Sequence, residues 1–178
     1  MNWPIKEVLR VLLVVAVLCG GTLSGATAVW AQEKSSNLAQ QVQGSWTLVS
    51  VYVEQDGKKV EQFGAKPRGS MILTPDGRFS MILMRESLPK FASNNRMKGS
   101  AEENQAVVQG SLAHYGRYKV VSEKEHTVNL SNEGSTFPNW DGEDQKRIIT
   151  VKGDEMSLIN PTPSIGGGVA YVIWKRAK

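Results

Sequence analysis

The chain has 178 residues, a formal net charge of +4 at pH 7 and a single cysteine. This length suffices for one domain with its own hydrophobic core and not comfortably for two. Basic residues are dispersed with no run longer than a pair, whereas nucleic-acid-binding proteins gather them into a patch. We therefore expect no nucleic-acid partner.

The N-terminal 31 residues have the three-part form of an export signal. Lys6 and Arg10 supply a basic start, and Val11–Leu18 is an apolar stretch too short to cross a bilayer. Val29-Trp30-Ala31 offers a cleavage site after small residues, and Ala26-Thr27-Ala28 is a second candidate. We predict a signal peptide over residues 1–31; the competing interpretation is an uncleaved membrane anchor.

Cleavage would remove the only cysteine, Cys19, and leave a mature chain without disulfides or cysteine ligands. An exported domain that needs no disulfide is typical of the bacterial envelope. We expect a periplasmic or secreted protein that keeps no membrane span after cleavage. Residues 32–43 are predicted to be a polar lead-in with a short helical turn, and 44–178 a single domain.

From Trp46 on, short segments rich in β-branched and aromatic residues predict strands. The first strand spans 46–53 and ends at the turn sequence Gln55-Asp56-Gly57-Lys58. The second and third strands, 69–74 and 78–85, flank the tight turn Pro75-Asp76-Gly77 and form the clearest hairpin of the chain.

After the third predicted strand, the spacing of the apolar residues changes from that of a strand to that of a helix. Ser100-Ala101-Glu102-Glu103 has the form of a helix start, with a serine cap and an acid three residues later, and the apolar positions from Ala106 to Ala113 follow with helical spacing. This predicts one helix between the third and fourth strands. Five further strands are predicted at 115–121, 126–131, 145–152, 156–160 and 169–175.

Eight short strands with tight turns predict an all-β antiparallel barrel or sandwich. Eight strands closed on themselves leave an interior able to hold one small ligand.

Several motifs occur in a fixed order over most of the chain: Gly44-Ser45-Trp46, Phe63-Gly64, Pro67-Arg68-Gly69, Thr74-Pro75-Asp76-Gly77, Met84-Arg85, Tyr115-Gly116 and Phe137-Pro138-Asn139-Trp140. In this order they resemble the bacterial and fungal lipocalin-like domain family, roughly over residues 40–176. The resemblance implies a calycin-type barrel of eight antiparallel strands with a central cavity. It implies no fixed reaction.

The same resemblance assigns a place to Trp46. In lipocalins the tryptophan of the Gly-x-Trp motif packs across the barrel floor, and a cation from the last strand lies on its ring. Trp46 with Lys175 or Arg176 fits that arrangement, which would be a stabilising contact. The alternative is an aromatic subsite for a cationic ligand, which the closed end of a barrel makes unfavourable.

Arginine and tyrosine are candidates for holding an acidic group. Arg68 and Arg85 lie near strand ends, and regular alternation turns only one of Tyr115 and Tyr118 inward unless the strand bulges at Gly116. An inward arginine with a tyrosine would bind a carboxylate or enolate in an apolar barrel. The alternative is an arginine solvated at the rim.

Three further candidates for the ligand-binding site each have a structural interpretation as well as a functional one. Met81 either lines an adaptable cavity or belongs to the core. His114 is either a cavity-facing general base or a helix-end histidine bonded to backbone carbonyls. The loop of Phe137 and Trp140 is either a lid over the barrel or a clamp beneath it.

With only two histidines and no acid at ligand spacing, we expect no metal site, no cofactor and no assigned catalytic residue. The candidate ligand-binding residues are Arg68, Met81, Arg85, His114, Tyr115, Phe137 and Trp140.

The leading hypothesis is an exported barrel that binds a small hydrophobic or amphipathic molecule, with an acidic group as one option. It predicts an open apolar cavity of several hundred cubic ångströms, on the order of a typical ligand pocket. The first alternative is a cofactor-free isomerase or cyclase acting in the same cavity. The second is a protein-interaction module that uses the 137–140 loop.

Overall fold

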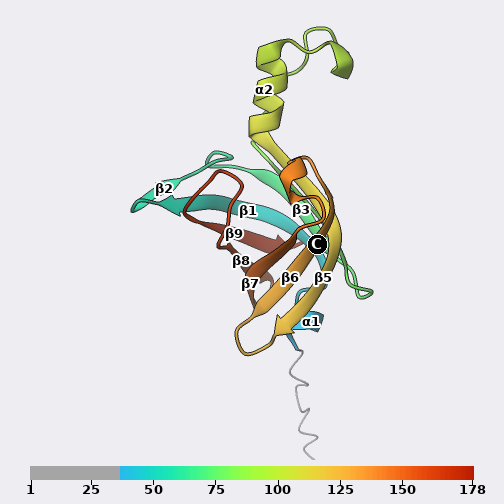
Figure 1. Cartoon of the computed structure of the whole chain (residues 1–178), viewed down its shortest axis with the longest axis vertical. Coiled ribbons are helices and arrows are strands. Elements are labelled where there is room, and N and C mark those ends of the chain that lie inside the picture. Colours follow the sequence, from blue (N-terminus) through green and yellow to red (C-terminus); the bar gives the residue numbers. More distant parts are fainter. Residues whose placement is uncertain (1–36) are drawn as a thin grey trace, which may run out of the picture. The chain divides into compact units, whose positions relative to one another are not determined.

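Nine antiparallel strands form one sheet in the computed structural model, which describes residues 37–178 (Figure 1). The sheet order is β2-β1-β3-β4-β5-β6-β7-β8-β9, and it closes because β9 also pairs with β1. Eight strands therefore make the barrel, and β2 is a short extra partner of β1. The strands are β1 Gly44–Gln55, β2 Lys58–Val60, β3 Arg68–Leu73, β4 Arg78–Met84, β5 Ser111–Ser122, β6 Thr127–Ser135, β7 Asp144–Lys152, β8 Glu155–Asn160 and β9 Val169–Arg176.

The predicted all-β, eight-stranded antiparallel barrel is confirmed, and the count of strands before the helix is corrected. Asp56 and Gly57 both have positive φ, 50° and 72°, which is the geometry of a two-residue hairpin turn. The chain therefore returns at once as β2, a strand the sequence analysis did not predict. As a result, helix α2 Ala101–Gly110 lies between β4 and β5 and not between the third and fourth strands.

Helix α2 begins where the sequence predicts and ends earlier. The Ser100 hydroxyl accepts from the Glu103 amide, and the Glu103 carboxylate accepts from the Ser100 amide, which completes a capping box. Strand β5 starts directly after Gly110, so Leu112 and Ala113 belong to the strand and not to the helix. The helix extends beyond the barrel (Figure 1), and its Val108 is 74% exposed.

The predicted signal peptide lies outside the described residues. Within residues 37–178, no helix has the length and apolar character needed to cross a membrane.

One end of the barrel, here called the closed end, is covered by the segment that the sequence analysis treated as a lead-in. It contains a single helical turn, α1 Leu38–Gln41, beside the turns at 74–77, 123–126 and 153–154. Leu38 and Val42 are buried in the core. The indole N–H of Trp46 donates to the Val42 carbonyl at 2.8 Å, so α1 is fastened to the first strand of the barrel.

Arg176, the last residue of β9, completes the closed end. Its guanidinium lies 4.2 Å from the centroid of the fully buried Trp46 ring. The same group donates to the carbonyls of Gln43 at 2.9 Å and Gln41 at 3.0 Å. Gly44 has φ of +114°, and a Cβ there would lie 3.1 Å from the guanidinium, so the motif needs glycine. Lys175, the other cation considered for this role, is exposed.

The opposite end, here called the open end, is bordered by the connections 61–67, 85–100, 136–143 and 161–168. Fully buried core residues near the closed end include Val42, Trp46, Leu73, Met156 and Trp174. Space for a ligand is therefore to be sought in the open half.

The contacts of Arg176 predict a specific loss of stability. Arg176→Met removes a cation–π contact and two hydrogen bonds from a charged donor, so the free energy of unfolding should fall by about 2 kcal/mol. Urea denaturation followed by tryptophan fluorescence measures the change. The matched control is Lys175→Met, at an exposed neighbouring position, which should change stability by less than about 0.5 kcal/mol. Equal losses in both variants would contradict the role of Arg176.

Candidate ligand-binding site

The barrel interior is not completely filled in its open half. A cavity of about 40 Å³ lies there, and its lining combines apolar side chains with a few polar ones. The lining includes Val51, Phe63, Met81, Leu83, Leu112, His114, Trp140, Arg147, Leu158, Asn160 and Val172. We call this space the inner cavity. It holds a few water molecules at most, far less than the several hundred cubic ångströms expected from the sequence.

A larger hollow of about 340 Å³ lies at the open end, lined by the end of α2, the 136–143 loop and the 161–168 loop. We call it the mouth. The mouth and the inner cavity share four lining residues: Gln62, Phe63, Leu112 and Ser164. Phe63 comes from the 61–67 loop, and its side chain is only 3% exposed. Its ring therefore lies between the two spaces and limits the size of the inner one.

Arg147 is the main polar group of the inner cavity. The residues of β7 alternate, so that Gln145, Arg147 and Ile149 are all buried, and Arg147 is 2% exposed. Its guanidinium donates to the Lys146 carbonyl at 2.9 Å and to the Gln145 side-chain carbonyl. Burial lowers its pKa to about 10, which still leaves it charged at neutral pH.

His114 faces the same cavity from β5 and is 4% exposed. Its Nδ1 lies 2.7 Å from the Asn132 Oδ1, and the Asn132 amide group donates to the Glu143 carbonyl at 3.2 Å. This orientation of Asn132 makes Nδ1 the protonated nitrogen. Burial lowers the pKa of His114 to about 4, against the raising effect of the Asn132 bond and with a smaller lowering effect of Arg147. The imidazole is therefore neutral at physiological pH.

Trp140 connects His114 with Arg147. Its ring centroid lies 5.2 Å from that of His114, and the Arg147 guanidinium lies 6.0 Å from the Trp140 centroid. Phe137 packs edge-on against Trp140 with centroids 5.7 Å apart. Of the two alternatives for this loop, the packing is that of a clamp, because Trp140 is 9% exposed and inserts into the barrel.

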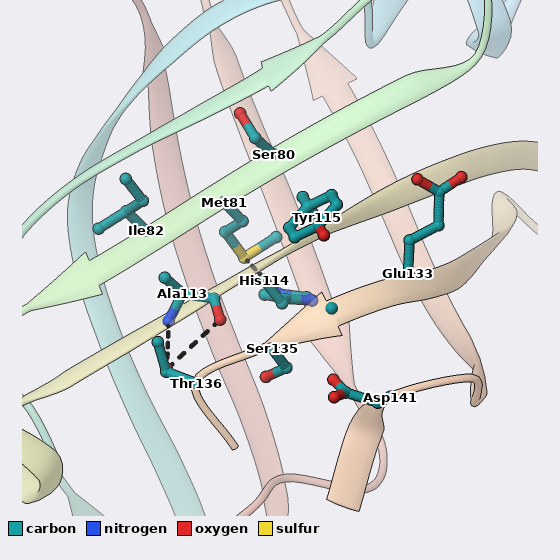
Figure 2. A pocket seen from close by; sticks show the side chains of 11 residues that line it. Ser80, Met81, Ile82, Ala113, His114, Tyr115, Glu133, Ser135, Thr136 and Asp141 are labelled. Carbon is teal, nitrogen blue, oxygen red and sulfur yellow. Dashed lines mark hydrogen bonds between the residues drawn. The ribbon is translucent and has the colours of Figure 1, made fainter. Parts of the chain in front are cut away.

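The seven sequence-based candidates fall into two groups. Met81, His114 and Trp140 line the inner cavity and Phe137 the mouth, and the Met81 sulfur lies 3.4 Å from His114 Nε2 (Figure 2). His114 is in a strand four residues beyond the end of α2, so the helix-end interpretation is wrong. The other three candidates, Arg68, Arg85 and Tyr115, are exposed and do not line the inner cavity, but Arg85 lines the mouth together with Phe137.

The alternation of β5 explains the position of the tyrosines. A bulge does occur between Tyr115 and Gly116, but it displaces the facing strand β6 and leaves β5 alternating. Tyr118 is therefore the inward tyrosine, and its hydroxyl donates to the Thr74 carbonyl at the closed end at 2.8 Å. Tyr115, 53% exposed, lies on the outer wall. No tyrosine joins an arginine inside the cavity.

Sequence reasoning missed Arg147 and Phe63. Arg147 was detectable, because Gln145 to Lys152 was predicted as a strand and Arg147 shares a face with Ile149 there. Phe63 carried no such signal, because it lies in an irregular loop where no period tells which side chain turns inward.

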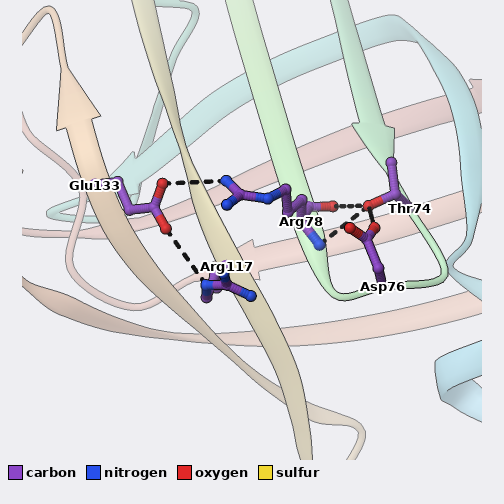
Figure 3. A network of polar contacts seen from close by, with 5 residues as sticks. All are labelled: Thr74, Asp76, Arg78, Arg117 and Glu133. Atoms are coloured by element: carbon purple, nitrogen blue, oxygen red, sulfur yellow. Dashed lines mark hydrogen bonds and ion pairs between the residues drawn. The ribbon is translucent and has the colours of Figure 1, made fainter.

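A further hollow, of about 570 Å³, lies on the outer wall of the barrel across β4, β5 and β6 (Figure 2). Its rim consists of outward side chains such as Ser80, Ile82 and Tyr115. Glu133 at its border is bonded to Arg78 at 3.3 Å and paired with Arg117 at 3.5 Å (Figure 3). A ligand here would remain largely in solvent, so we regard the inner cavity and the mouth as the better candidate.

In residues 37–178, no group of three or more histidine, cysteine, aspartate or glutamate side chains is placed to hold a metal ion.

A closed barrel of eight antiparallel strands, with one end plugged and the other bordered by loops, defines a calycin-type barrel protein. The lipocalin-like domain family matches residues 43–177, and the chain belongs to this family.

The chain is also similar to two named proteins. The 4'-hydroxy-3'-methoxypropiophenone carrier protein ppsC of Aspergillus oryzae is 28% identical over 105 residues, which are 54% of this chain and 95% of that protein. A crystal structure of a point mutant of the fluorescent protein UnaG is 12% identical, with a TM-score of 0.36, and the match covers 78% of this chain and 98% of that one.

The lowered pKa of His114 predicts a pH dependence of stability. Above pH 6.5 the imidazole is neutral in both the folded and the unfolded chain. Between pH 6.5 and about 4 only the unfolded chain takes up the proton. The free energy of unfolding should therefore decline over this interval as the pH falls, by about 3 kcal/mol in total.

Denaturant melts at a series of pH values test this expectation, with His114→Gln as the variant and His126→Gln as the matched control. The His114→Gln protein should have a flatter profile between pH 4 and 6.5. The control should keep the slope of the unchanged protein. Identical slopes in all three proteins would exclude a buried neutral imidazole.

Proposed function

We propose that this protein binds a small, mainly apolar molecule in the open half of its barrel and carries it without transforming it. The observation behind the proposal is that an inner cavity with a largely apolar lining adjoins a mouth of about 340 Å³, and that the buried side chain of Phe63 lines both. Ligand pockets in proteins are commonly at least this large and predominantly apolar, with a few polar groups that fix orientation.

Binding of a whole ligand requires Phe63 to move, because the inner cavity alone holds about 40 Å³. The 61–67 loop can shift without breaking the pairing of barrel strands, since it lies outside them. Its internal backbone bond, from the Gly64 amide to the Glu61 carbonyl, is local to the loop. Displacing the ring would join the cavity to the mouth and expose Arg147 and His114 to the ligand.

The similarity to the Aspergillus oryzae carrier protein supports binding as the function. The ligand in that protein's name is a small aromatic ketone, which combines an apolar ring with a few oxygen atoms. A cavity with an apolar wall and a few polar groups at one side suits a ligand of that general chemistry.

Catalysis has weaker support. The isomerase or cyclase alternative needs a proton acceptor, and a general base works best when its pKa lies near the working pH. The pKa of His114 is lowered to about 4, and the exposed Tyr115 and Arg85 do not line the inner cavity. A protein-interaction role of the 137–140 loop has little support too, because Trp140 is 9% exposed.

The role of Phe63 can be tested with phenylnaphthylamine, a neutral probe that fluoresces in apolar surroundings. The unchanged protein should bind it, and Phe63→Leu should bind it several-fold more tightly because a smaller side chain competes less for the space. Leu112→Trp, which fills the passage between cavity and mouth, should weaken binding. Fluorescence titration measures all three affinities.

Ile72→Ala is the matched control, because Ile72 is an apolar residue of the outer wall, 42% exposed. It should leave the probe affinity unchanged. If Ile72→Ala lowered the affinity as much as Leu112→Trp, the probe would be bound on the surface. If neither the unchanged protein nor Phe63→Leu bound the probe, the proposed function would be wrong.

We also propose that the protein is exported to the periplasm or secreted, on the basis of the signal-like sequence of residues 1–31. Mass spectrometry of the protein from fractionated cells should then find a mature chain that begins at Gln32, or at Val29 if the second site is used. The mature chain should not react with maleimide, because Cys19 has been removed. A full-length, maleimide-reactive protein in the cytosolic fraction would refute export.

A further inference from the structure

We propose that Arg147 forms an oxyanion subsite at the inner end of the binding cavity, so that the ligand is an amphiphile with an apolar body and one anionic oxygen group. This inference rests on the proposed function and names the class of ligand. It starts from a charge imbalance within the barrel.

Arg147 is a buried cation without a buried anion. The ion pairs of the described residues are Lys59–Glu61, Arg78–Glu133, Arg117–Glu133 and Arg176–Asp154, and all of them involve partly or largely exposed side chains. Arg147 is 2% exposed, and within residues 37–178 no carboxylate lies within ion-pair distance of it. Burying an unpaired charge is costly, and buried arginines are therefore usually paired.

The neighbours of Arg147 are neutral and leave part of its hydrogen-bonding capacity unused. A guanidinium has five N–H donors in a fixed fork. In the described part of the chain, two hydrogen bonds are made, to the Lys146 carbonyl and to the Gln145 side chain. The Trp140 ring at 6.0 Å adds only a weak electrostatic contact. Donors therefore remain for a group that enters the cavity.

The position of Arg147 suits a ligand head group. It lines the inner cavity, beyond Phe63 as seen from the mouth. Asn160 lines the same cavity, and its side-chain oxygen accepts from the Thr162 amide, so its NH₂ group remains available as a second donor. The remaining wall is largely apolar. A ligand with its oxyanion on Arg147 and its apolar body directed toward the mouth would contact both the polar donors and the apolar wall.

An oxyanion is favoured over a neutral oxygen for a physical reason. Hydrogen bonds between a guanidinium and an anion are shorter and about twice as strong as those between neutral groups. Inside a barrel of low effective dielectric, the attraction between the two charges is also larger than in water. Carboxylate, sulfonate and similar groups share this chemistry.

The test compares two fluorescent probes that differ in one group: phenylnaphthylamine, which is neutral, and anilinonaphthalene sulfonate, which is the same aromatic system with a sulfonate. The unchanged protein should bind the sulfonate at least tenfold more tightly. Arg147→Met should abolish this preference, so that the ratio of the two affinities falls to about one. Arg117→Met, which removes an arginine from the outer wall, is the matched control and should retain the preference.

A second measurement needs no variant and therefore does not depend on whether Arg147→Met folds. Decanoate and decanol have the same chain length, and decanoate should displace the neutral probe from the unchanged protein at least tenfold more effectively. Equal displacement, or an unaltered sulfonate preference in folded Arg147→Met, overturns the oxyanion subsite. The proposed function then still stands, provided that the neutral probe binds; if neither probe binds, it is the proposed function that fails.

Discussion

The fold depends on the contact between Arg176 and Trp46, because it joins the last strand, the first strand and the N-terminal turn in one place. The sheet closes only through the pairing of β1 with β9. The guanidinium fixes that seam at the closed end, since it lies on the Trp46 ring and binds the carbonyls of Gln41 and Gln43. The strands between β1 and β9 are thereby held in a closed barrel. Among the described residues, the loops at the open end make no contact that this closure requires, so their conformation is less constrained.

The two buried or half-buried arginines of the barrel illustrate a division of tasks between its ends. Arg176 at the closed end has an aromatic ring, two carbonyls and Asp154 as partners, so its charge is well compensated. Arg147 in the open half has only neutral partners among the described residues. The arginine at the closed end thus stabilises the fold. The uncompensated charge of Arg147 lies in the open half, which loops cover.

The sequence predicted the eight barrel strands well, because alternation along a half-buried strand is a local signal that the closed sheet preserves. It also predicted the capping box of α2 and three cavity residues, Met81, His114 and Trp140.

It did not predict the size of the cavity. That size depends on Phe63, whose position is decided by how the 61–67 loop packs on other segments and not by any pattern near it. Arg68 and Arg85, the sequence-based candidates for an inward arginine, are exposed, whereas the alternation of β7 turns Arg147 inward.

An unpaired cation in the interior has a consequence for the protein when it is empty. Desolvation of Arg147 is not offset by an anion, so the ligand-free barrel is less stable than its packing alone would make it. If the proposed oxyanion enters, it removes that penalty and stabilises the fold by mass action. Empty molecules then unfold more often and are degraded sooner in a cell. If the protein binds such a ligand as proposed, its amount in the cell would rise with the supply of that ligand.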